Sequence, residues 1–105
     1  MQIYDESANG SEVTVRPGER FEVRLKETPT TGFRWRLTSD GSPICDLVSD
    51  SFEAPHENIP GGPGRRIFIF QVEHGGRAMI ELTSQRSWEK DASGGALFRL
   101  TITAP

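Results

Sequence analysis

Residues 21–37, FEVRLKETPTTGFRWRL, hold two strand patterns joined by a loop. On each side of the loop, apolar side chains alternate with charged ones. Alternation with a period of two is typical of a β-strand that has one buried face and one wet face. The apolar members are Phe21, Val23 and Leu25 before the loop, and Phe33, Trp35 and Leu37 after it. This stretch therefore predicts two β-strands whose apolar faces pack into a common core.

Similar patterns along the rest of the chain predict about seven to eight short strands. Residues 13–15, 78–82 and 98–102 alternate in the same way, and 66–72 is a nearly continuous apolar run. Residues 44–54 are less regular and predict one or two short strands, while Gly75-Gly76 predicts a tight hairpin turn. We expect an all-β, immunoglobulin-like antiparallel β-sandwich. Its expected core contains Phe21, Val23, Phe33, Trp35, Ile67 or Phe68, Ile80, Leu82, Phe98 and Leu100.

Length and charge exclude several classes of protein. The 105 residues include 12 basic and 15 acidic ones, a net charge of −3, and these are interspersed, so no basic stripe indicates nucleic acid. No window approaches the roughly 18 apolar residues of a membrane span. With Cys45 as the only cysteine, a disulfide within the chain is impossible. We expect a single domain, residues 1–105, that is monomeric and carries no cofactor.

The N-terminus does not settle the compartment. Residues 1–6 show no basic region followed by an apolar one, so no signal peptide is visible. The expectation is a cytoplasmic protein as the chain stands, or a periplasmic or secreted one if a leader has been removed.

The loop within the opening stretch has the composition of a rigid turn. Pro29 sets its own φ and moves Thr28 out of the helical region. Gly32 permits a backbone conformation that a side chain disfavours. Between them, Thr30 and Thr31 are stiff at χ1. Such a loop presents small polar groups in one shape, which favours binding because less entropy is lost on association.

Two further segments join this first loop (28–32) as candidates for a binding surface. The second loop (60–64) is rich in glycine, and the third loop (85–90) contains Arg86-Ser87-Trp88. An exposed Trp beside an Arg has the composition of an interface hot spot. By our strand count the three loops are alternate connections, so we expect them at one end of the sandwich.

These motifs resemble those of the chagasin family, inhibitors of papain-like cysteine proteases. Pro29-Thr30-Thr31-Gly32-Phe33 matches the family's N-P-T-T-G-[YF] signature after its first position, where Thr28 replaces Asn. Gly61-Gly62-Pro63-Gly64 is similar to its G-x-G-G loop, with Pro63 inserted. Arg86-Ser87-Trp88 is similar to its R-P-W loop, with Ser87 in place of proline. The order and spacing agree, so the resemblance covers the whole chain.

The resemblance implies a function and a site. Three loops would form a wedge that reversibly occludes the cleft of a papain-like cysteine peptidase, with no covalent bond and no catalysis by this chain. The first loop would lie over the catalytic Cys and His, the second along the unprimed subsites, and the Trp of the third on the primed rim. The implied protease-binding residues are Thr28, Pro29, Thr30, Thr31, Gly32, Phe33, Gly61, Gly62, Pro63, Gly64, Arg86, Ser87 and Trp88.

Other interpretations remain open at this stage. An immunoglobulin-like adhesion or carbohydrate-binding module would also use Trp88 and polar loops. Cys45 could be a nucleophile with His56 or His74 as base, although a small buried thiol is the commoner case. The two His and one Cys are not at metal-ligand spacing. Arg86 would either contact a partner or brace the first loop.

The charged residues of the predicted strands are interpreted as solvated faces. This applies to the many arginines and to four glutamates in particular: Glu12, Glu19, Glu22 and Glu27. Charges on the strands also discourage edge-to-edge pairing.

Overall fold

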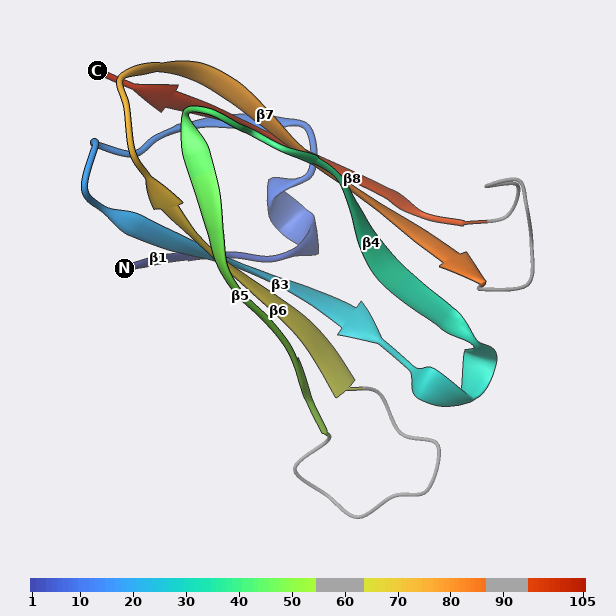
Figure 1. Cartoon of the computed structure of the whole chain (residues 1–105). Helices are drawn as coiled ribbons and strands as arrows, with labels where there is room; N and C mark the ends of the chain where they lie inside the picture. The colour runs from blue at the N-terminus through green and yellow to red at the C-terminus, as the bar shows by residue number, and fades with distance from the viewer. Residues whose placement is uncertain (55–63, 87–94) are drawn as a thin grey trace.

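The computed structural model describes residues 1–54, 64–86 and 95–105, which form two four-stranded sheets packed face to face (Figure 1). The strands are β1 (Gln2–Tyr4), β2 (Ser11–Thr14), β3 (Arg20–Glu27), β4 (Phe33–Asp40), β5 (Cys45–Glu53), β6 (Gly64–Val72), β7 (Gly76–Arg86) and β8 (Leu97–Ala104). Two single-turn 3₁₀ helices, η1 (Glu6–Ala8) and η2 (Pro29–Thr31), lie in the connections. One sheet has the order β1-β3-β6-β5 and the other β2-β8-β7-β4.

The predicted β-sandwich of seven to eight strands is confirmed, with one addition at its edges. The central pairs are antiparallel, but β1 pairs with β3 and β2 pairs with β8 in parallel. These edge strands have only three and four residues, too short for a clear alternating pattern. Within the described ranges, no helix is long and apolar enough to cross a membrane.

The core lies between the two sheets and includes most of the residues that were predicted for it. Phe21 of β3 and Phe70 of β6 are directly opposite in the register, and their rings stack with centroids 5.1 Å apart. Phe68 is 1% exposed and belongs to the core, whereas Ile67, on the opposite face of β6, is buried outside the core cluster. The remaining confirmed members are Val23, Ile80, Leu82, Phe98 and Leu100.

Two predicted core residues are only half-buried. Trp35 packs against the core from its rim, and Phe33 lies outside the cluster. Both belong to the first half of β4, near the end of the sandwich, where the backbone of Trp35 meets the charged side chain of Glu27. The prediction failed there because alternation identifies the inward face of a strand but not where along it the apolar core stops.

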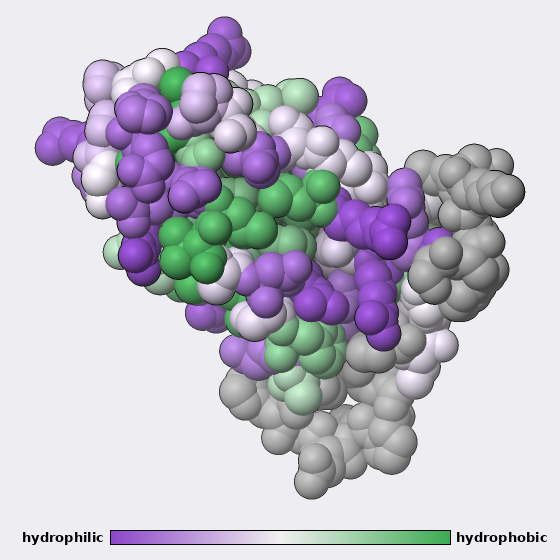
Figure 2. Space-filling view, viewed as in Figure 1, coloured by the Kyte–Doolittle hydropathy of each residue, from purple (hydrophilic) through white to green (hydrophobic). Residues whose placement is uncertain are grey.

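The edge strands β4 and β5 are irregular, and β5 exposes apolar side chains. Each has a register shift, between Leu37 and Ser39 in β4 and between Leu47 and Ser49 in β5. Leu47 and Val48 of β5 are exposed. Figure 2 shows apolar side chains gathered on the face of the molecule turned to the viewer. Bulges and charges at an edge discourage pairing with another chain, and β5 carries both.

The Gly75-Gly76 turn connects the sheets and does not close a hairpin. Gly75 lies in the short connection after β6, and Gly76, with a φ of 137°, is the first residue of β7. The two strands belong to different sheets. The prediction of a hairpin was wrong because a local turn signal does not say whether the flanking strands pair.

Candidate functional site

The strand ends that flank the three loops lie at one end of the sandwich, which we call the loop end. In one sheet, Glu27 is opposite Gly64, and Glu53 is opposite Arg65. In the other, Phe33 is opposite Arg86. Figure 1 shows both chain termini at the opposite end. The loop end is therefore free of the termini.

The structure describes part of the predicted site. Residues 28–33, Gly64 and Arg86 are described, whereas Gly61, Gly62, Pro63, Ser87 and Trp88 lie outside the described residues, as does His56. Gly64 and Arg86 belong to strands, as the first residue of β6 and the last of β7. Gly64 is closely packed, since a Cβ there would overlap the ring of Phe52 and lie 2.6 Å from the backbone oxygen of Glu53. Glycine is thus needed at the point where β6 begins.

The first loop is held by hydrogen bonds within itself. Thr31 donates both its N–H (3.1 Å) and its hydroxyl (2.7 Å) to the carbonyl oxygen of Thr28. The Thr31 hydroxyl in turn accepts the N–H of Phe33 at 3.3 Å. Gly32 has a φ of 79°, which confirms the predicted need for glycine. Thr28 therefore closes the loop through its backbone carbonyl, and the hydroxyl of Thr31 caps the loop from within.

Arg86 braces the first loop from the neighbouring strand. Its Nε donates to the carbonyl oxygen of Thr31 at 3.3 Å. Its guanidinium also lies over the ring of Phe33, 4.4 Å from the centroid, a cation–π geometry. Of the two roles left open for Arg86, the structure thus shows the brace.

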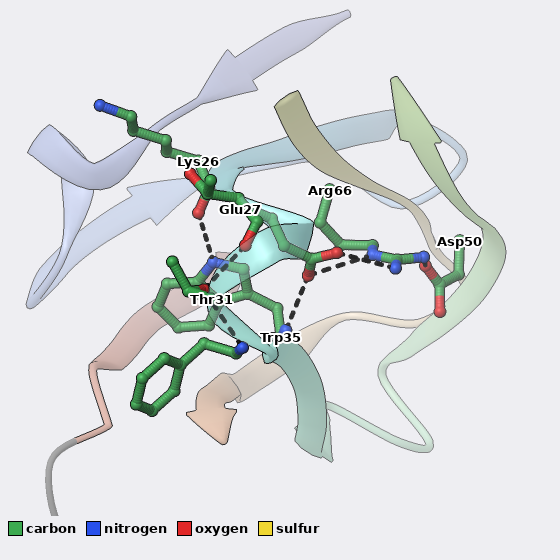
Figure 3. A network of polar contacts seen from close by, with 8 residues as sticks. Lys26, Glu27, Thr31, Trp35, Asp50 and Arg66 are labelled. Atoms are coloured by element: carbon green, nitrogen blue, oxygen red, sulfur yellow. Dashed lines mark hydrogen bonds and ion pairs between the residues drawn. The ribbon is translucent and has the colours of Figure 1, made fainter. Parts of the chain in front are cut away.

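The two ends of the first loop are joined by Trp35 (Figure 3). Its backbone N–H donates to Oε2 of Glu27 at 2.8 Å, and its indole Nε1–H donates to the carbonyl oxygen of Lys26 at 2.9 Å. Trp35 follows the loop and the other two residues precede it. These hydrogen bonds connect the two sheets, because β3 belongs to one sheet and β4 to the other.

Glu27 is a buried charge with a partner. It is 4% exposed, and its Oε1 accepts from Nη2 of Arg66 at 2.9 Å. This hydrogen bond raises the pKa of the Arg66 guanidinium above its ordinary value. Arg66 also reaches Oδ1 of Asp50 on β5 at 3.3 Å (Figure 3). The interpretation of Glu27 as solvated was wrong, and Glu22, 5% exposed, is buried as well.

The alternation of apolar residues in the sequence already indicated that Glu27 and Arg66 lie on the buried faces of their strands. Glu27 continues the odd-numbered series of Phe21, Val23 and Leu25, so the period of two places it on the buried face of β3. Arg66 likewise has the parity of Phe68 and Phe70 on β6. Opposite charges on two buried faces indicate an ion pair, since a buried charge needs a partner.

Two hollows lie at the loop end, and the first loop lines one of them. A hollow of about 420 Å³ is lined by Lys26, Trp35 and Gly64 among others. A second, of about 300 Å³, is lined by Thr28, Thr31 and Phe33 together with residues of the third loop's flanks. Thr30 and Thr31 are exposed. A partner can therefore approach this loop at its exposed tip and from the side of the second hollow.

Cys45 has the properties of a structural thiol. It is 2% exposed and belongs to the core. Burial, with a smaller effect of Asp40, raises the pKa of Cys45 to about 11, so the thiolate needed for nucleophilic attack is disfavoured. Within the described ranges, no cluster of three or more His, Cys, Asp or Glu residues could hold a metal ion.

The arrangement defines a class of proteins that bind a partner through loops at one end of a β-sandwich. Residues 14–102 match the family model described as Chagasin family peptidase inhibitor I42. The chain thus belongs to the chagasin family of peptidase inhibitors, and the resemblance inferred from its motifs is confirmed.

Individual proteins agree with this assignment. Chagasin of Trypanosoma cruzi is 29% identical over 100 residues, 91% of this chain and 91% of that protein. The cysteine protease inhibitor EhICP2 of Entamoeba histolytica has a TM-score of 0.88 at 19% identity, over 99% of this chain and 95% of that one. PbICP-C, solved in complex with falcipain-2, has a TM-score of 0.68 at 16% identity, over 98% and 89%. The two structures show the shared fold.

The cap supplied by Thr31 can be tested by a nearly isosteric change. Thr31→Val removes the hydroxyl that bonds Thr28 and Phe33. We expect amide hydrogen exchange at Phe33 to rise about fivefold or more, the scale of one lost hydrogen bond of about 1 kcal/mol. Thr31→Ser keeps the hydroxyl and should exchange like the wild type. Equal exchange in both variants would contradict the cap.

The buried thiol predicts a pH dependence of stability. Because the folded-state pKa of Cys45 is raised from 9.0 to about 11, unfolding releases a proton between these values. The free energy of unfolding should fall as the pH rises through this window, by an amount on the order of 2 kcal/mol. Urea unfolding from pH 8 to 11 measures it, with Cys45→Ala as the control that lacks this contribution. Identical pH profiles would refute the assignment.

Proposed function

We propose that this protein is a reversible inhibitor of papain-like cysteine peptidases that occludes the active-site cleft with the loop end. Membership in the chagasin family of peptidase inhibitors carries the proposal. The likeness to EhICP2, a cysteine protease inhibitor, and to PbICP-C, which binds falcipain-2, supports the class of partner.

The shape of the first loop suits such a role. Its tip carries the exposed hydroxyl residues Thr30 and Thr31, and internal hydrogen bonds and Arg86 hold it in one form. A loop that is ordered before binding loses little conformational entropy on entering a cleft. Small hydroxyl side chains also match the polar surroundings of a catalytic Cys and His.

The full set of contact residues is part of the proposal. The first loop contributes residues 28–33, the second loop Gly61, Gly62, Pro63 and Gly64, and the third loop Arg86, Ser87 and Trp88. We assign Arg86 mainly to bracing, and Trp88 to the aromatic anchor on the primed rim of the protease.

The proposal assigns the chain no catalytic activity of its own. The family consists of peptidase inhibitors, and the thiol of Cys45 is buried and protonated at neutral pH. Inhibition would therefore arise from occlusion, with neither partner covalently modified. We further propose that residues 1–105 act as a single domain, since strands from β1 to β8 contribute to one sandwich.

Titration of papain with the purified chain tests the function. We expect reversible inhibition at submicromolar concentration, full recovery of activity on dilution, and an intact inhibitor by mass spectrometry. Absence of inhibition at micromolar concentration would refute the proposal. Binding on a glycan array without inhibition would favour an adhesion or carbohydrate-binding module instead.

The aromatic anchor can be tested separately. Trp88→Ala should weaken inhibition by ~2 kcal/mol or more, the scale of an interface hot spot. His74→Ala is the matched control, because His74 is exposed at the opposite end, between β6 and β7. The inhibition constants for papain measure both effects. If Trp88→Ala inhibits as well as His74→Ala, the third loop does not anchor the complex.

A further inference from the structure

The two ends of the first loop are not held together by a strand ladder, as they would be in a hairpin. In a hairpin, the ladder between the flanking strands holds the two ends of the loop together. Here β3 and β4 belong to different sheets, so no ladder joins them. The distance between the loop ends then depends on other contacts, chiefly those that Trp35 makes with Lys26 and Glu27.

We propose that Glu27 is a positioning residue for inhibition, whose carboxylate ties the two ends of the first loop across the sheets. Arg66 holds this carboxylate in place and links it to the strands that flank the second loop. The effect on inhibition rests on the proposed function. The hydrogen bond between Glu27 and Trp35 that forms the tie is present in the free protein.

The environment of Glu27 leaves its carboxylate little freedom. Oε2 accepts from the N–H of Trp35 at 2.8 Å and lies 3.4 Å from Nε of Arg66, while Oε1 accepts from Nη2 of Arg66 at 2.9 Å. The side chain is 3% exposed, so water cannot replace these partners. A different rotamer would leave a buried charge without its hydrogen bonds, which is costly. The position of the Trp35 backbone is therefore set by Glu27.

Arg66 extends the tie to the second loop. It lies on β6, two residues after Gly64, and its Nη1 donates to Asp50 on β5 at 3.3 Å. Its guanidinium also approaches the ring of Phe52, 5.6 Å from the centroid. Since β5 and β6 flank residues 54–63, one network contacts the strands on either side of both loops (Figure 3). The strands that flank the first two loops are thus coupled through Glu27 and Arg66.

Substitutions at Glu27 and Arg66 can remove the charge of Glu27 and its role as a hydrogen-bond acceptor one at a time. Arg66→Met leaves the charge without its partner, which destabilises a buried carboxylate. Adding Glu27→Gln removes the charge but keeps a side-chain oxygen for the N–H of Trp35. Adding Glu27→Leu instead removes the charge and the acceptor together, at similar volume. If the hydrogen bond from Trp35 to residue 27 positions the loop, the two double variants must differ in inhibition and in amide exchange at Trp35.

The experiment compares the two double variants in the full chain. We expect Glu27→Gln/Arg66→Met to inhibit papain within about threefold of the wild type. Glu27→Leu/Arg66→Met should be weaker by about tenfold or more, the scale of leaving the N–H of Trp35 without an acceptor. Concentrations are normalised to the folded fraction measured by circular dichroism, so that a change in stability alone does not alter the inhibition constant.

A second readout does not depend on any protease. Amide hydrogen exchange at Trp35 should be close to wild type in Glu27→Gln/Arg66→Met and at least about tenfold faster in Glu27→Leu/Arg66→Met. Glu81→Gln is the matched control, since Glu81 pairs with Arg99 at 2.8 Å and accepts from the Thr38 hydroxyl at 3.0 Å in the other sheet. This variant should change neither readout.

The outcomes are distinguishable. Equal exchange at Trp35 and equal inhibition in the two double variants would overturn the positioning role. If the wild type itself fails to inhibit papain, the proposed function fails, while the exchange data still test the tie. Should Glu27→Leu/Arg66→Met not fold, Arg66→Met alone is compared with Glu27→Gln/Arg66→Met. Recovery of inhibition and exchange by the second substitution supports the proposal, and no recovery overturns it.

Discussion

Strands β3 and β4 lie in opposite sheets, so the loop between them is held without a ladder of its own. The chain replaces that ladder with two hydrogen bonds from Trp35 and one buried carboxylate, Glu27. A buried carboxylate needs a cationic partner, which Arg66 provides from a third strand. This requirement also ties β3 and β4 to the other edge of the first sheet, because the same guanidinium reaches Asp50 on β5.

The remainder of the sandwich serves as the platform for these contacts. Phe21 and Phe70, whose rings stack within one sheet, belong to a core that the two sheets share, and close packing in such a core leaves the sheets little freedom to slide. Loops carried by a rigid scaffold can keep one shape in the absence of a partner, which reduces the entropy lost on binding. The Glu27–Arg66 pair at the loop end positions the first loop, while the apolar core between the sheets stabilises the fold.

Much of the fold was predictable because half-buried strands have a period of two. The predictions for β3, β4 and β8 agree with the structure, and so does the need for glycine at position 32. The region of β5 looked irregular because its register shift near Val48 adds a residue and reverses the alternation. The short parallel strand β1 carried too few residues for a pattern, and the Gly75-Gly76 turn did not reveal that it crosses between sheets.

The sequence by itself determined the strand pattern, the conformation of the first loop and the family, because each depends on residues close together in the chain. Only the tertiary structure decided how the loop is fastened. Glu27 meets Arg66 across 39 positions, and Arg86 reaches Thr31 across 55. Parity placed both charges on buried faces, but which buried charges pair depends on sheet order and register. Those are set by the packing of the whole chain, since neither sheet can bury its apolar face without the other.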